Sequence, residues 1–278
     1  MHGPAPILIN TPKIELWPHG LLQARSNHDA RLLARARHVL RRKRDGRFLA
    51  VDTADGLEPL LHGWKREPGI EAALAALAAC PAPTADESLT RNLPLDRLQH
   101  RLQQLGIDAD YARRTGLPLV AEPAALAFAG FDRYRRALWL LHGAARAWQR
   151  MQDAARRDDI LLEAISGYRS HDYQIGIFER KLARGLALAD IVTVNAAPGY
   201  SEHHSGCALD ISTPGEPPAE DSFELTGAFA WLGEHAAGHG FHMSYPRDNP
   251  HGIVYEPWHW CWIAGPVPGD RTTGVSTA

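Results

Sequence analysis

Two short segments in the last third of the chain combine residue types that bind metals and move protons. Residues 201–211 contain His203 and Asp210, which offer an imidazole nitrogen and a carboxylate oxygen, both suitable zinc ligands. The second segment places Glu256 three residues before His259. If His259 joins the first two, zinc has three protein ligands and keeps an open position for water, as a catalytic site requires.

Glu256 is then placed to act as a general base toward that water, because Pro257 fixes the backbone between base and ligand. Tryptophans at 258, 260 and 262 are also typical of an aromatic core strand. The two interpretations are compatible, since alternate residues of a strand face opposite sides.

A third segment carries Arg169. The apolar run Ile160–Ser166 has the length of a strand, and a new helix is expected from Asp172 to about Gly185. Arg169 therefore lies at a strand-to-helix turn, where side chains often project into a cleft.

Taken together, the three segments resemble the VanY-type branch of the M15 metallopeptidases. These are zinc D-alanyl-D-alanine and L,D-carboxypeptidases that trim peptidoglycan stem peptides. The matching motifs are Gly167-Tyr168-Arg169-Ser170 with Gln174, Ser201-x-His203-x-x-Gly206-x-Ala208-x-Asp210, and Glu256-Pro257-Trp258-His259. Their order and spacing are compatible with the family over residues 117–265.

The resemblance implies one Zn²⁺ ion and a role for each matching residue. The zinc ligands would be His203, Asp210 and His259, and Glu256 would be the catalytic base. Arg169 would polarise the scissile carbonyl. Gln174 and Ser201 would hold the terminal carboxylate of the substrate, and Tyr245 would line the pocket.

The implied reaction removes a C-terminal D-amino acid, D-Ala, from a peptidoglycan stem peptide or muropeptide by metal-activated water. A wall-lytic endopeptidase of the same zinc branch stays open as an alternative. A non-catalytic binding module is a third reading, although Glu256 and all three ligands are present.

Several neighbouring residues need separate interpretation. Cys261 stands two positions after His259, where the family commonly has an arginine or similar polar residue. On a strand, Cys261 would share a face with His259, which would allow a thiol near the metal. His204 is interpreted as supporting the site or lying at its rim. His235 and His239 are four residues apart, but the glutamate precedes the first, so the zincin pattern is absent. They are expected at the surface.

The strands and helices expected around these residues indicate an α+β fold. A small antiparallel sheet is expected to carry the zinc ligands, packed by helices over 138–157 and 223–237. Residues 91–278 would form the peptidase domain.

Residues 1–90 are expected to form a mainly helical region of unknown role. A helix with a solvated basic face is expected over 29–44, a strand over 47–52 and a helix over 72–79. A linker over 80–84 and a helix over 96–105 would follow.

Composition sets wider limits. The net charge of −2 over 278 residues argues against a surface built for nucleic acid, and three cysteines cannot form a disulfide framework. Histidine stands out with 15 residues.

No signal peptide or membrane-spanning run is recognised, so the chain as written is expected in the cytoplasm. A misannotated start would allow the periplasm or cell envelope. The oligomeric state is left open.

Overall fold

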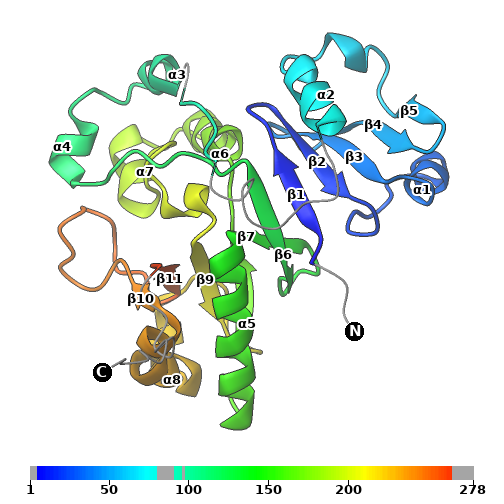
Figure 1. Cartoon of the computed structure of the whole chain (residues 1–278). Coiled ribbons are helices and arrows are strands. Elements are labelled where there is room, and N and C mark those ends of the chain that lie inside the picture. The colour runs from blue at the N-terminus through cyan, green and yellow to red at the C-terminus, as the bar shows by residue number, and fades with distance from the viewer. Residues whose placement is uncertain (1–4, 80–90, 96–97, 265–278) are drawn as a thin grey trace, which may run out of the picture.

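The computed structural model describes residues 5–79, 91–95 and 98–264. It confirms the α+β class, with two antiparallel sheets on either side of one long helix (Figure 1). The linker expected over 80–84 lies outside the described residues, as does the start of the helix expected over 96–105.

The larger sheet has seven strands in the order β5-β4-β3-β2-β1-β6-β7, and every neighbouring pair is antiparallel. Its N-terminal elements are β1 (Ile7–Asn10), β2 (Ile14–Pro18), α1 (Asn27–Leu33), β3 (His38–Arg42), β4 (Phe48–Thr53), β5 (Gly56–Pro59), a 3-10 turn (Trp64–Arg66) and α2 (Ile70–Ala78). The expectation of a mainly helical N-terminal region is therefore wrong. The strand over 47–52 and the helix over 72–79 are confirmed within a residue or two.

The helix expected over 29–44 is wrong in its second half. It ends at Leu33, and β3 then lies between β2 and β4 with Val39 and Leu40 buried. The basic residues of this stretch do not form a solvated helix face. Most of them pair with carboxylates of other elements, as Arg41 does with Glu15 at 2.7 Å.

The rest of the chain builds the second sheet and its helices. In order these are α3 (Leu98–Gln104), α4 (Tyr111–Thr115), β6 (Ala125–Phe131), β7 (Ala137–Leu140), α5 (His142–Arg157), β8 (Glu163–Ser166), α6 (His171–Ala183), α7 (Leu188–Val194), a 3-10 turn (Glu202–Ser205), β9 (Ala208–Ser212), a 3-10 turn (Asp221–Leu225), α8 (Gly227–His235), a 3-10 turn (Ala236–His239), β10 (Phe241–Met243) and β11 (His259–Trp262). The four-stranded sheet runs β10-β11-β9-β8.

α5 joins the two sheets. The helix expected over 138–157 begins only at His142, because Ala137–Leu140 pairs with β6 as a strand. The buried face of α5 includes Trp148 and Met151, which share one hydrophobic core with residues of β6, β7, β9 and α8. The helix expected over 223–237 is divided between α8 and its two flanking 3-10 turns. Within the described residues, no helix is long and apolar enough to cross a bilayer.

Candidate active site

The centre of the smaller sheet holds two of the predicted ligands. Asp210 lies on β9, a strand buried along its whole length, and pairs directly with His259 on β11. Directly opposed residues of an antiparallel pair bring their Cβ atoms to about 4.5–5.5 Å. Strand pairing alone therefore brings these two side chains together.

His203 reaches the same place from the 3-10 turn Glu202–Ser205 that precedes β9. Gly206 ends this turn with a φ of 72°, a conformation that glycine adopts without steric cost. A Cβ at Gly206 would stand 2.6 Å from Leu126 Cδ2 and 2.9 Å from the Leu141 nitrogen. The motif glycine thus lets the turn pack tightly against the larger sheet and return the chain to β9.

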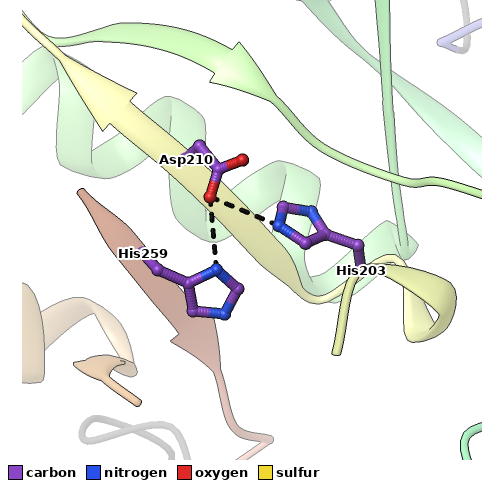
Figure 2. A group of neighbouring side chains, drawn as sticks. All are labelled: His203, Asp210 and His259. Carbon is purple, nitrogen blue, oxygen red and sulfur yellow. Dashed lines mark hydrogen bonds and ion pairs between the residues drawn. The ribbon is translucent and has the colours of Figure 1, made fainter. Parts of the chain in front are cut away.

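The three side chains meet around one carboxylate oxygen. His203 Nε2 is 3.3 Å and His259 Nδ1 is 3.2 Å from Asp210 Oδ1, as Figure 2 shows. One ligand atom from each residue lies within 4.8 Å of the others, and all three residues are buried. Ligand atoms around a tetrahedral zinc are about 3.4 Å apart when the metal–ligand distance is about 2.1 Å.

The hydrogen bonds of His203 indicate that a cation belongs here. Its Nδ1 lies 2.7 Å from the carbonyl oxygen of Gly167, so Nδ1 carries the proton. Burial, followed by the charge of Arg169, lowers the pKa of His203 to about 4, so the ring is neutral at pH 7. Among the described residues its buried Nε2 has no hydrogen-bond partner, yet its lone pair faces the Asp210 carboxylate. A metal ion between the two acceptors resolves that conflict.

His259 is held from its other side by Glu202. The Nε2 of His259 donates to Glu202 Oε2 at 2.9 Å, which leaves Nδ1 toward Asp210. Burial opposes protonation of the ring, but the hydrogen bonds to Asp210 and Glu202 outweigh it and raise the pKa of His259. A carboxylate on the far nitrogen of a ligand histidine is the usual way to fix its orientation.

Glu256 and Arg169 complete the centre. Glu256 lies in the turn before β11, with its Oε2 3.8 Å from His259 Nδ1, and burial raises the pKa of Glu256 to about 7. Arg169 lies beside the carboxylate, with its Nη2 3.7 Å from Asp210 Oδ2. The structure thus brings together all five residues predicted to bind metal or act in catalysis.

The turn that carries Arg169 is fixed by the histidine segment. As expected, Arg169 lies between β8 and α6, whose first turn is capped by Ser170. The backbone N–H of Arg169 donates to the carbonyl of His203 at 3.2 Å. His204 Nδ1 lies 2.6 Å from the Arg169 carbonyl, while His204 Nε2 accepts from the Gly199 N–H at 3.0 Å. His204 is fully buried, so it supports the site and is not at its rim.

The three residues predicted to bind substrate line one cavity with the ligands. This cavity measures about 310 Å³, and Gln174, Ser201 and Tyr245 all border it. Gln174 donates from Nε2 to the Ala196 carbonyl at 3.0 Å, which leaves one amide hydrogen for a ligand. The ring centroids of Tyr245 and His259 are 4.8 Å apart, and no partner within the described part of the chain hydrogen-bonds the Tyr245 hydroxyl.

The remaining residues singled out in the sequence lie outside the ligand set. Cys261 is buried, and burial with the nearby Glu202 carboxylate raises the pKa of its thiol. Within the described residues, the group of side chains that could hold a metal does not include it. His235 and His239 lie against the ring of Trp231 at the end of α8.

Two acidic residues that contact the predicted site residues or their turn were missed by sequence reasoning. One sequence signal could have indicated Glu202, since it is an acidic residue directly before a candidate ligand. No such signal marks Glu122 in the sequence. Its buried carboxylate accepts from Lys43 Nζ at 2.5 Å and from the Tyr168 hydroxyl, and Tyr168 directly precedes Arg169. Asn10 Nδ2 also donates to the Tyr168 oxygen at 2.8 Å. N-terminal strands thereby contact the arginine turn.

The chain is similar in sequence to several bacterial proteins. VanXYC of Enterococcus gallinarum, a bifunctional D-Ala-D-Ala dipeptidase and D-Ala-D-Ala carboxypeptidase, is 31% identical over 154 residues, which cover 52% of this chain and 77% of that protein. A D-alanyl-D-alanine carboxypeptidase of Enterococcus faecalis is 34% identical, with coverage of 41% and 45%. YodJ of Bacillus subtilis is 39% identical, with coverage of 42% and 43%. The chain therefore spans less than half the length of the last two.

Among solved structures, the LdcB LD-carboxypeptidase shares 30% sequence identity, with a TM-score of 0.49 over 53% of this chain and 72% of that one. A sequence model of the VanY family, described as D-alanyl-D-alanine carboxypeptidase, matches residues 138–265, which contain every candidate site residue. Since VanXYC is also matched over most of its length, the chain belongs to the VanY family of D-alanyl-D-alanine carboxypeptidases.

Proposed function

We propose that this protein is a zinc-dependent carboxypeptidase that removes a C-terminal D-amino acid from peptidoglycan stem peptides. One observation carries the proposal. The unprotonated, unpartnered Nε2 of His203 faces a carboxylate beside His259, Glu256 and Arg169 in one cavity. The E. faecalis relative is a D-alanyl-D-alanine carboxypeptidase, and the E. gallinarum relative has D-Ala-D-Ala carboxypeptidase activity, which supports this proposal.

His203, Asp210 and His259 would hold the metal through Nε2, Oδ1 and Nδ1. When bound, zinc supplies Lewis acidity to the scissile carbonyl and lowers the pKa of water toward about 7. One carboxylate in the ligand set reduces the net charge at the centre relative to three histidines.

Glu256 moves the proton. Its carboxylate takes the proton from the attacking water and delivers it to the amine of the departing D-amino acid. The surroundings that raise its pKa to about 7 make the protonated form accessible for the second transfer.

Arg169 supplies positive charge where the oxyanion of the tetrahedral intermediate develops. Its backbone is fixed at both N–H and C=O by the histidine segment, so the turn that carries the side chain is held beside Asp210. Loss of a comparable donor costs about 10²–10³ in rate. Gln174 and Ser201 border the same cavity and would bind the terminal carboxylate of the peptide.

The test is release of free D-Ala from purified stem tetrapeptide and pentapeptide, with and without a chelator. We expect chelator-sensitive release from at least one peptide, and restoration by added zinc. Glu256→Gln should lose turnover by at least about 10²-fold while still binding zinc. No chelator-sensitive D-Ala release from either peptide would refute the carboxypeptidase. Cleavage of intact sacculi without free D-Ala would assign the site to an endopeptidase instead.

A further inference from the structure

A second cavity lies between the N-terminal strands and the arginine turn. It measures about 470 Å³, larger than the metal-site cavity. One wall comes from β2, β3, β4 and the loop 21–25, and the other from residues 132, 134–139, 166–170 and 173. Arg169 borders both cavities, so the two lie next to each other across this residue.

The lining of this second cavity is strongly basic. Six basic side chains border it against two acidic ones, Glu15 and Asp132. The basic residues are Arg25, Arg41, Lys43, Arg135, Arg136 and Arg169. Such a concave, basic wall attracts anions from solution and concentrates them.

Two of these cations carry charge that no neighbouring carboxylate neutralises. Arg41, Lys43 and Arg136 are paired with Glu15, Glu122 and Asp132. Within the described part of the chain, Arg25 and Arg135 form no ion pair. The guanidinium of Arg25 donates to the Gly46 carbonyl at 3.0 Å and lies over the Phe48 ring at 4.7 Å, while the backbone N–H of Arg25 donates to Asp29 Oδ2 at 3.2 Å. Both arginines are exposed and available to a ligand.

Aromatic side chains complete the lining and indicate a ligand larger than a simple ion. Tyr134 and Tyr173 leave 49% and 43% of their surface exposed at this cavity. Large aromatic faces bind flat or apolar parts of a ligand, while arginine matches the geometry of a carboxylate through two parallel hydrogen bonds.

We propose that this cavity binds the part of the substrate on the amino side of the scissile bond, and that it selects an acidic peptide with a free carboxylate there. The proposal rests on the carboxypeptidase function above, because it takes Arg169 as the point where the scissile bond lies. The N-terminal strands are then part of the substrate site, with Arg25 and Arg135 as specificity-determining residues.

The test compares three substrates. The first is the pentapeptide Ala-γ-D-Glu-Lys-D-Ala-D-Ala with a free α-carboxylate on its glutamate. The second is the same peptide with that carboxylate amidated, and the third is acetyl-Lys-D-Ala-D-Ala. We expect kcat/KM to be about tenfold higher for the free acid than for the amide, the size of a hydrogen bond to a charged group. The preference should shrink as ionic strength rises.

The combined variant Arg25→Gln and Arg135→Asn removes both free charges. Asparagine suits position 135, because Arg135 has a φ of 60° and asparagine is among the residues that tolerate it. The control variant, Arg31→Gln with Arg184→Asn, makes the same charge change at exposed arginines that border neither cavity.

The first variant should abolish the preference for the free acid and leave hydrolysis of the acetylated tripeptide unchanged, whereas the control should keep the preference. An unaltered ratio of kcat/KM between acid and amide in the first variant would overturn the proposal, as would an equal loss on all three substrates.

Binding distinguishes a failure of this proposal from a failure of the proposed function. Calorimetry with the product tetrapeptide, which lacks the last D-Ala, requires no turnover. A Kd about tenfold weaker in the first variant than in the control supports the acidic-peptide cavity even if no peptide is hydrolysed. Equal Kd values in the two variants refute it even if the enzyme is active.

Discussion

Replacing Lys43 by methionine should destabilise the protein strongly, because it leaves the Glu122 carboxylate buried without its cation. The Lys43 side chain is fully buried, and that of Glu122 is 5% exposed. Burial alone would raise the pKa of Glu122, but the charges of Lys43 and His171 lower it from 4.5 to about 2. A lowering of this size corresponds to about 3 kcal/mol of folding free energy at pH 7.

Loss of one partner of a buried ion pair typically costs about 3–5 kcal/mol, in agreement with that figure. We would measure urea unfolding by tryptophan fluorescence at pH 7 with chelator present. The double variant Lys43→Met with Glu122→Gln should regain at least half of the loss, since no charge is left buried. Lys65→Met, at an exposed position, should change stability by less than about 0.5 kcal/mol.

The sign of the pH dependence of folding stability follows from the same pKa. Because the pKa of Glu122 is lowered in the folded state, its contribution to the free energy of unfolding is complete above pH 4.5 and is lost as the pH falls toward about 2. Glu122→Gln should therefore flatten this part of the stability profile. A loss below about 1 kcal/mol for Lys43→Met with an unchanged denaturant slope would refute the reasoning. So would an unchanged acid profile in Glu122→Gln.

Three further predictions concern the site. Glu202→Ala should weaken zinc binding by about 10–100-fold, measured in competition with a chelating dye. Glu202→Gln should weaken it less, because the amide oxygen remains as an acceptor for the His259 ring. Equal zinc affinities of the wild-type protein and Glu202→Ala would show that the carboxylate does not position the ring. Gly206→Ala should cost about 2 kcal/mol or more in urea unfolding, since it adds a left-handed alanine and a contact at 2.6 Å with Leu126; a smaller cost would mean that the turn relaxes. His204→Phe keeps an aromatic side chain but removes the hydrogen bonds to the Arg169 carbonyl and from the Gly199 N–H, so kcat/KM should fall about tenfold while zinc affinity stays constant. A parallel loss of both would indicate a general packing defect.

The position of the candidate site could be predicted because its residues lie in contiguous segments. His203, Gly206 and Asp210 occur within eight positions, and the glycine and the strand that follow the histidine are visible in the sequence. What brings His259 to Asp210 is the pairing of β9 with β11, which joins segments 49 residues apart. The resemblance to a family provided that link, whereas local patterns did not.

The N-terminal sheet was missed for a different physical reason. Residues 29–44 have apolar positions compatible with a helix, and strongly basic residues are unusual in an inner strand. Their charges are neutralised by acids from β2, β4 and residues far along the chain, such as Glu122 for Lys43. Local periodicity contains no information about such partners. The same limit hid the strand at Ala137–Leu140, whose apolar run continues directly into α5.

The shared seven-stranded sheet has a consequence for any attempt to trim or recombine this enzyme. The family match begins at residue 138, inside β7, whereas the neighbour of β7 in the sheet is β6, which in turn pairs with β1. A fragment cut at the start of the match would expose the N–H and C=O groups of β7 as a bare edge, which promotes association between chains. A stable minimal enzyme would need grafted replacements for residues 125–131 and 7–10 to cover that edge.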